Sequence, residues 1–402
     1  MKIAIVSDMH LGYERFSEDA LSQAKEALQK ASELADAIII PGDIFDKRYP
    51  KPDVISQAMK LFREILSKNF GAEVAEYSGQ NKIYTKKPIV AIPGTHERIA
   101  KGKENAVQLL SLAGLLVDTS EATTTLSKGD ERVCIFGLGG VSEEMVKPEL
   151  ESLNPKPVPG AFNIFMFHQS IYELLPFSST FIKYSDLPEG FDLYACGHMH
   201  NRVEAKVHGK PLLIPGSTVL TQLKSEEQGN KGFIIFDTES YKYEFVKIKS
   251  RPFIIKEISA NQTDAEKIIE ECKSTISDAV SKGGVKPILK IKISGTASRG
   301  FEKADMGLQS IAAKYSKEAI ISFDTQSLSI EGSESAMEEL REGKVDSMPV
   351  KELGMHLLSE KLSKSKVRGS FKPSELFTLL SSEESKDKVL KAAGELLLKE
   401  DD

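Results

Sequence analysis

The sequence lacks any apolar run of the roughly 20 residues that a membrane-spanning helix requires, so we expect no such helix. Cysteine is also scarce: the three cysteines are scattered and form no C-x-x-C pair. This distribution argues against a disulfide framework or a zinc–cysteine site and fits a reducing compartment. A strand pattern begins at Lys2 without a charged leader and apolar stretch before it, so we expect a cytoplasmic protein rather than a secreted one.

An excess of positive charge is lacking as well. The 402 residues carry a formal net charge of −6, so the net charge of the chain gives no indication of a nucleic-acid partner. Any such binding must use local basic patches, or metal ions that neutralise clustered acids. The composition, 40% hydrophobic and 28% charged, is typical of a soluble globular protein, and the length suits two or three domains.

What the sequence does contain is a set of buried-strand patterns that end in chemically capable side chains. Five short apolar runs are predicted to be such strands: residues 2–6, 37–40, 88–92, 162–167 and 191–195. Helical patterns over residues 17–35, where Ser17 is the predicted N-cap, 53–68 and 104–115 separate the first of them, which indicates an α/β fold. The residues that follow the five strands are Asp8 and His10, Asp43, His96, His168, and His198 with His200.

The last of these strand ends, Cys196-Gly197-His198-Met199-His200, carries two histidines two positions apart. In extended structure residues i and i+2 point to the same side, which predicts that both imidazoles face one point. Gly197 would let the backbone pass close to its surroundings. Taken alone, the pair is better explained as two loop histidines with no function. Five of the seven histidines stand at strand ends, however, and this placement favours a metal site at the carboxyl edge of the sheet.

Two carboxylates and four histidines form a mixed oxygen and nitrogen ligand set, which suits Mn²⁺, Fe²⁺ or Zn²⁺ better than Ca²⁺ or Mg²⁺ alone. The set is too large for one ion, so we expect two ions about 3.5–4 Å apart that share a carboxylate. Such a pair activates a water for attack on phosphorus and holds the phosphate oxygens. A further histidine that is not a ligand can steady the phosphate or protonate the leaving oxygen.

The ordered motifs resemble those of the calcineurin-like metallophosphoesterases: Asp8-x-His10, Gly42-Asp43-x-x-Asp46, Gly94-x-His96-Glu97, His168 and Gly197-His198-x-His200. Three further stretches resemble the meiotic recombination eleven/SbcD-type DNA double-strand-break repair nucleases in their archaeal form: His168-Gln-Ser-Ile171, Pro215-Gly-Ser217 and Lys231-Gly-Phe233. The resemblance implies a sandwich of β-sheets flanked by helices, with a small α/β capping domain and C-terminal helices.

The resemblance also implies roles for the strand-end residues. It implies one Mn²⁺ held by Asp8, His10, Asp43 and His200. A second Mn²⁺ is held by Asp43, as a bridging ligand, with His168 and His198. His96 contacts the scissile phosphate. The family has Asn where this sequence has Thr95, and a hydroxyl is the poorer and shorter ligand, so we expect weaker binding of the second ion.

Four regions follow from the patterns and the resemblance: a nuclease domain over 1–250, an α/β capping domain over 251–331, a linker with helical segments over 332–365, and a C-terminal helical segment over 366–402. The resemblance implies that the C-terminal helices bind the coiled-coil root of an ABC-type ATPase and that the nuclease domain forms a homodimer. The residues alone leave a second interpretation open, in which the apolar faces of these helices dock on the protein's own core.

The function that the resemblance implies is a double-strand 3′–5′ exonuclease and single-strand endonuclease. It would process DNA ends near the nucleoid, in double-strand-break repair, with two Mn²⁺ ions per subunit. One alternative is a phosphatase or phosphodiesterase for small esters, and another is a DNA-end-tethering scaffold whose chemistry Thr95 impairs. Basic residues after two of the motifs are either contacts to backbone phosphates or solvated loop cations: Arg48, Arg98, Lys101 and Lys103.

Overall fold

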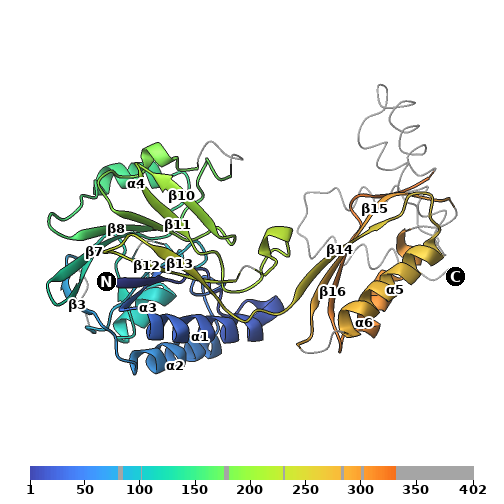
Figure 1. Cartoon of the computed structure of the whole chain (residues 1–402), viewed down its shortest axis with the longest axis horizontal. Helices are drawn as coiled ribbons and strands as arrows, with labels where there is room; N and C mark the ends of the chain where they lie inside the picture. The colour runs from blue at the N-terminus through green and yellow to red at the C-terminus, as the bar shows by residue number, and fades with distance from the viewer. Residues whose placement is uncertain are drawn as a thin grey trace, which may run out of the picture. The chain divides into compact units, whose positions relative to one another are not determined.

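Figure 1 shows the computed structural model of the chain, which describes residues 1–79, 85–100, 102–175, 181–229, 231–281, 285–299 and 303–331. The chain divides into two compact units. One unit comprises Met1–Glu257, Glu271–Lys292 and Gly307–Asp324, and the other comprises Ile258–Glu270, Ile293–Met306 and the described part of Thr325–Asp402. The domain boundaries expected after residues 250, 331 and 365 stay predictions, and the expected linker and C-terminal helices lie outside the described residues. No helix in the described ranges is both long and apolar enough to cross a membrane.

The N-terminal region contains a six-stranded sheet with the strand order β13-β12-β1-β2-β4-β5. Its strands are β1 (Lys2–Ile5), β2 (Ala37–Pro41), β4 (Ile89–Ile92), β5 (Val117–Asp118), β12 (Gly232–Asp237) and β13 (Tyr243–Lys247). β1, β2 and β4 are neighbours and run parallel. The carboxyl ends of three of the strands that precede candidate site residues therefore lie along one edge of this sheet.

A second, seven-stranded sheet has the order β10-β11-β9-β8-β7-β6-β3. Its strands are β3 (Glu73–Tyr77), β6 (Thr123–Lys128), β7 (Glu131–Leu138), β8 (Phe162–Phe167), β9 (Leu193–Cys196), β10 (Val203–Val207) and β11 (Lys210–Ile214). β8 and β9 pair in parallel, so the other two strands that precede candidate site residues also end side by side.

Helices cover the outer faces of the two sheets. Figure 1 shows α1, α2 and α3 beneath the six-stranded sheet and α4 over the seven-stranded one; they are α1 (Ser17–Leu34), α2 (Pro52–Leu66), α3 (Ala106–Leu112) and α4 (Val146–Leu153). Neighbouring residues of β2 face opposite cores, as the period of a strand requires. Ile38 shares a core with Phe62 of α2, whereas Ile39 shares the core between the sheets with Ile164. The predicted sandwich of β-sheets flanked by helices is confirmed.

Two helix starts differ from the predicted ones. Ser17, predicted to cap α1, is instead its first residue, because a 3₁₀ turn over Glu14–Phe16 leads directly into the helix and no side chain caps it. α3 begins after Asn105 rather than at residue 104. There the Asn105 side chain accepts from the backbone N–H of Gln108, and the Gln108 side chain accepts from that of Asn105, which forms a capping box.

The remaining elements are β14 (Phe253–Ser259), α5 (Ala265–Ser281), β15 (Ile288–Ala297), α6 (Leu308–Lys314), β16 (Ile320–Asp324) and β17 (Leu328–Ile330). Their strands form a sheet in the order β14-β15-β16, with β17 paired to β15. The strands and helices of this region form an α/β arrangement. A 3₁₀ turn over Lys303–Met306 is separated from α6 by Gly307, which has a left-handed backbone with φ 56°.

Candidate metal centre

The carboxyl ends of β1, β2 and β4 in one sheet meet those of β8 and β9 in the other. An isolated parallel β-bridge between Ser7 and Ser217 connects the loop after β1 to the segment after β11. Gly197 lies close to the backbone of β2: a Cβ atom there would stand 2.1 Å from the carbonyl oxygen of Pro41. No side chain fits in that space, which confirms that Gly197 permits a close backbone approach.

Asp8, His10 and His200 form a first cluster, in which one potential ligand atom of each lies within 4.8 Å of the others. His10 Nε2 faces His200 Nε2 at 3.0 Å, and His200 Nε2 lies 4.0 Å from Asp8 Oδ1. The buried His10 Nδ1 points the other way, toward Asp46 Oδ1 at 3.5 Å, and makes no well-aligned hydrogen bond within the described part of the chain. Two imidazole nitrogens that face each other beside a buried carboxylate fit the donor set of a transition-metal ion.

Asp43, His168 and His198 form a second cluster with ligand atoms within the same 4.8 Å limit. His168 Nδ1 lies 2.7 Å from the carbonyl oxygen of Pro41, to which it must donate, and this leaves Nε2 as the ligating nitrogen. His168 Nε2 is 3.1 Å from Asp43 Oδ2 and has no well-aligned hydrogen bond in the described part of the chain, as expected of atoms that share a cation. Asp43 belongs to this cluster alone, so its bridging role stays a prediction.

His96 stands at the mouth of the centre. Together with His10 and Asp46 it forms a third group of potential ligands, and its Nδ1 lies 2.5 Å from the Asp46 carbonyl oxygen. Its side chain is 41% exposed, whereas those of His10 and His168 are buried, so His96 is more accessible to an incoming substrate than these two. Thr95 is exposed beside it, with Oγ1 3.3 Å from His198 Nδ1 at the second cluster.

The prediction that His198 and His200 face one point is wrong, because each belongs to a different cluster. β9 ends at Cys196, and His198 then adopts a left-handed backbone with φ 76°, which breaks the alternation of an extended chain. Asp8, His10 and Asp43 are also left-handed, with φ of 53°, 46° and 50°. Such conformations are unfavourable for residues other than glycine and gather at functional sites, where the surrounding structure maintains them.

Burial and mutual charge govern the protonation of the clusters. Burial disfavours a charged His168, but the carboxylates of Asp43 and Asp8 outweigh it and raise the pKa of His168 to about 9, so a metal ion would have to displace the proton on Nε2. Burial lowers the pKa of His198 to about 4, with the charge of His168 adding to it, and lowers that of His200 to about 2, with the charge of His10 adding. Both are therefore neutral near pH 7, the form in which histidine binds a metal.

Glu97 is part of the Gly94-x-His96-Glu97 motif, and the sequence pattern predicts no role for it. Its buried carboxylate accepts three backbone N–H groups, from Asp43 at 3.2 Å, Phe45 at 2.6 Å and Gly94 at 2.7 Å. Burial and then the charge of Asp43 raise the pKa of Glu97 to about 8. Glu97 thus joins the loops after β2 and β4, and the only signal for it in the sequence is an acid next to His96.

The four candidate DNA contacts differ in placement. Arg98 lines a pocket of about 370 Å³ together with Thr95 and His198, directly beside the second cluster. Arg48 and Lys103 are exposed on loops. Lys101 lies outside the described residues.

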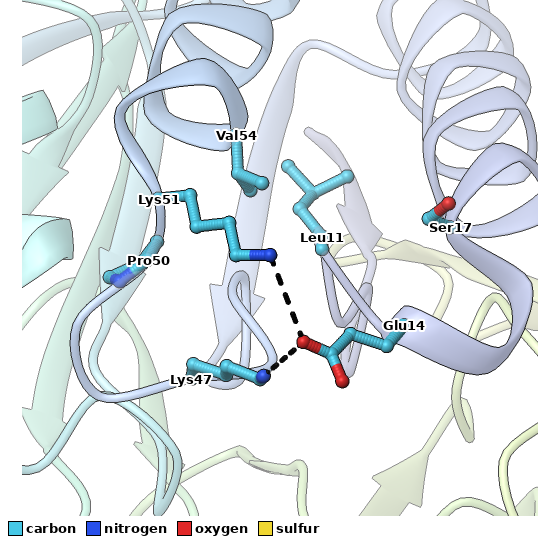
Figure 2. A pocket seen from close by; sticks show the side chains of 8 residues that line it. Leu11, Glu14, Ser17, Lys47, Pro50, Lys51 and Val54 are labelled. Carbon is cyan, nitrogen blue, oxygen red and sulfur yellow. Dashed lines mark hydrogen bonds and ion pairs between the residues drawn. The ribbon is translucent and has the colours of Figure 1, made fainter.

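A smaller pocket of about 210 Å³ lies between the chain after His10 and the chain after Asp46. Leu11 and Val54 form an apolar wall, as Figure 2 shows, and Lys47 and Lys51 both reach toward Glu14. The Glu14 Oε1 atom lies 2.5 Å from Lys47 Nζ and 3.9 Å from Lys51 Nζ. A phosphate group at this rim would compete with Glu14 for the two ammonium groups.

Residues 1–202 match the family model described as calcineurin-like phosphoesterase. The chain belongs to the calcineurin-like phosphoesterases. Members of this family catalyse ester hydrolysis at phosphorus, and the two ligand clusters lie within the matched residues.

Several named relatives indicate a more specific similarity than the family model does. The chain is 28% identical to the DNA double-strand break repair protein Mre11 of Methanopyrus kandleri, over 74% of this chain and 69% of the relative. It is 25% identical to the protein of that name from Sulfolobus acidocaldarius, over 74% and 75% of the two chains. The double-strand break repair protein mre-11 of Caenorhabditis elegans is 28% identical over 72% of this chain and 44% of its own length. The expected resemblance to the archaeal form of these repair nucleases is confirmed.

Proposed function

We propose that this phosphoesterase is a DNA nuclease that processes the ends of double-strand breaks. The observation that carries the proposal is the convergence of two separate ligand clusters at the strand ends, with the exposed His96 between them and the solvent. Its activities would be double-strand 3′–5′ exonuclease and single-strand endonuclease. The similarity to the Mre11 repair proteins supports DNA as the substrate.

We propose two Mn²⁺ ions per subunit as cofactors. Asp8, His10 and His200 would hold one ion, and His168 and His198 the other, with Asp43 between them. The mixture of carboxylate and imidazole donors supports Mn²⁺ over ions that prefer oxygen alone. When bound, such ions supply positive charge that activates water and offsets the charge developing on the phosphate.

The side chains of the protein hold the substrate phosphate and move protons. His96 Nδ1 donates to the carbonyl oxygen of Asp46, so Nε2 is the nitrogen left to face the phosphate or the leaving oxygen. Arg98, beside the second cluster, supplies a guanidinium for a neighbouring backbone phosphate. Arg48, Lys101 and Lys103 are proposed as further phosphate contacts. Phosphate contacts carry little sequence information, as the processing of arbitrary ends requires.

The proposal extends to partners. By resemblance, the nuclease domain forms a homodimer, and the C-terminal helices over residues 366–402 bind a coiled-coil ABC-type ATPase at DNA ends, in the cytoplasm near the nucleoid. Co-purification of the full chain with such an ATPase, lost in a chain that ends near Ser365, tests this part. Retention of the ATPase by the shortened chain would contradict it.

A substrate panel tests the catalytic part. The full chain is incubated with Mn²⁺ and a nitrophenyl phosphate ester, a cyclic nucleotide or end-labelled linear duplex DNA. We expect DNA degradation that His96→Ser abolishes. Hydrolysis of the small esters without cleavage of DNA would favour a small-molecule phosphoesterase, and DNA binding without any hydrolysis would favour a tethering scaffold.

A further inference from the structure

Three side chains behind His200 form a continuous polar chain that leads away from the first cluster. His200 Nδ1 lies 2.5 Å from Thr221 Oγ1. Thr221 Oγ1 in turn lies 3.3 Å from Glu227 Oε1, to which Lys231 Nζ donates at 2.9 Å. The other ring nitrogen of His200, Nε2, is the one that faces His10. We refer to Thr221, Glu227 and Lys231 as the His200 relay.

The ion pair at the end of the relay is buried. Glu227 and Lys231 are each only 2% exposed. A buried pair has a desolvation cost that often cancels its attraction, so stability alone is a weak explanation for it. Its hydrogen bonds are nevertheless well made: Lys231 Nζ also donates to Ser217 Oγ at 2.7 Å, and Glu227 Oε2 accepts the Gln222 backbone N–H at 2.9 Å. The pair is therefore held in one position.

The chemistry of the three groups fixes the direction of each hydrogen bond. An ionised carboxylate can only accept hydrogen bonds. Glu227, kept charged by Lys231, therefore accepts the hydrogen bond that the Thr221 hydroxyl donates. Toward His200, the Thr221 oxygen can then only accept a hydrogen bond. His200 Nδ1 must therefore carry a proton and donate it in that hydrogen bond. With its proton on Nδ1, a neutral imidazole presents a lone pair at Nε2. That is the nitrogen that points into the first cluster.

We propose that the His200 relay positions the imidazole of His200 and sets its tautomer, so that Nε2 is the ligand of the first ion. The inference rests on the metal centre under the proposed function. Thr221, Glu227 and Lys231 are positioning residues, since each acts through His200 and none touches substrate.

His200 differs in this respect from two other histidines of the centre. His168 and His96 direct Nδ1 at the backbone carbonyls of Pro41 and Asp46. A carbonyl only accepts, so these two tautomers need no further support. A hydroxyl both donates and accepts, and Thr221 becomes a one-way acceptor only because Glu227 lies beyond it. The buried charge of Glu227 is therefore needed to fix the tautomer of His200. A backbone carbonyl in place of Thr221 would fix it without such a charge.

Mn²⁺ titration calorimetry on the full chain tests the relay. Thr221→Val keeps the shape of the side chain and removes the hydroxyl, and we expect the tighter Mn²⁺ site to weaken by about 10–100-fold, the usual effect of losing such a supporting contact. Thr221→Ser should restore affinity to within about threefold. Thr218→Val is the matched control: the Thr218 hydroxyl is buried in the same segment and has no hydrogen-bond partner among the described residues, so its loss should leave Mn²⁺ affinity unchanged.

The tautomer itself is a second readout. In metal-free protein with ¹⁵N-labelled histidine, the His200 signals, assigned with His200→Ala, should report a proton on Nδ1 in the wild type and in Thr221→Ser. Thr221→Val should move the proton partly to Nε2. Equal Mn²⁺ affinity and an equal tautomer in wild type and Thr221→Val would overturn the relay. Failure of the wild type to bind Mn²⁺ at all would instead overturn the proposed function.

Discussion

Asp43 and Glu97 lie on two strand-end loops that hydrogen bonds join in both directions. The backbone N–H of Asp43 donates to Glu97 Oε2 at 3.2 Å, and the backbone N–H of His96, next to Glu97, donates to Asp43 Oδ1 at 2.9 Å. The loop that carries a candidate metal ligand and the loop that carries the candidate catalytic histidine are therefore one unit. Glu97 connects them without facing the solvent.

Replacement of Glu97 should destabilise the protein strongly. Glu97→Ala leaves three buried backbone N–H groups without their acceptor, and each such group costs about 1–3 kcal/mol. We expect a loss of about 3 kcal/mol or more in the free energy of unfolding, measured with urea. Glu151→Ala, at an exposed position on α4, is the control and should change this free energy by less than about 0.5 kcal/mol. An equally small effect of Glu97→Ala would contradict the connecting role.

The two histidines after β9 should fail in different ways. His200→Ala removes a ligand of the first cluster and should abolish the tighter Mn²⁺ site, while His198→Ala should remove the weaker site and leave the tighter one. Calorimetric Mn²⁺ titrations separate these outcomes. His208→Ala, whose imidazole contacts the carbonyl of Leu187 outside the centre, is the control and should bind like the wild type. Loss of the same site in both variants would show that the two clusters are not distinct.

Thr95→Asn should strengthen the second site. Thr95 Oγ1 lies beside His198, and a longer amide oxygen at this position reaches further toward Asp43 and His168. We expect half-maximal DNA cleavage at an Mn²⁺ concentration about tenfold lower, a change of about 1.4 kcal/mol. Thr95→Ser retains the short hydroxyl and should behave like the wild type. An Mn²⁺ requirement that Thr95→Asn leaves unchanged would refute the idea that Thr95 weakens the second ion.

The sequence predicted those elements that have a clear local pattern of apolar residues. β1, β2, β4, β8 and β9 are apolar runs buried on both faces, and the residues after them were recognised by type and position. β6 was not predicted, since Thr123–Lys128 is largely polar, and β5 has only two residues. Such strands form because neighbouring strands pair with them, and the pattern of apolar residues in a short segment does not indicate that pairing.

The candidate site was predicted in composition but not in detail. Alternation along an extended chain placed His198 with His200, and the left-handed backbone of His198 separates them. The relay was missed for another reason: Thr221 meets His200 only after the intervening 21 residues fold back, and no spacing rule indicates that contact. Local periodicity indicates which residues leave a strand, whereas their contact partners depend on the tertiary fold.

Asp118 provides a pH test of stability away from the metal centre. Burial raises the pKa of its carboxyl above the ordinary value of 3.8, and hydrogen bonds from Ser120 offset this only in part. The folded state then keeps the proton to a higher pH than the unfolded state, so stability falls as pH rises from about 3.9 through the raised pKa. Asp118→Asn retains the oxygen that accepts from Ser120 and removes the buried charge. Its Tm should exceed that of the wild type at neutral pH, by about 2–4 °C per kcal/mol, and the difference should vanish at low pH. A constant difference at every pH would contradict this account.

The most direct test of the central claim is anomalous diffraction from crystals of the full chain soaked in Mn²⁺. Two clusters of ligand atoms predict two manganese peaks, one among Asp8, His10 and His200 and the other among Asp43, His168 and His198. Their separation should be about 3.5–4 Å. A single peak, or two peaks away from these six side chains, would contradict the two-ion centre on which the proposed function depends.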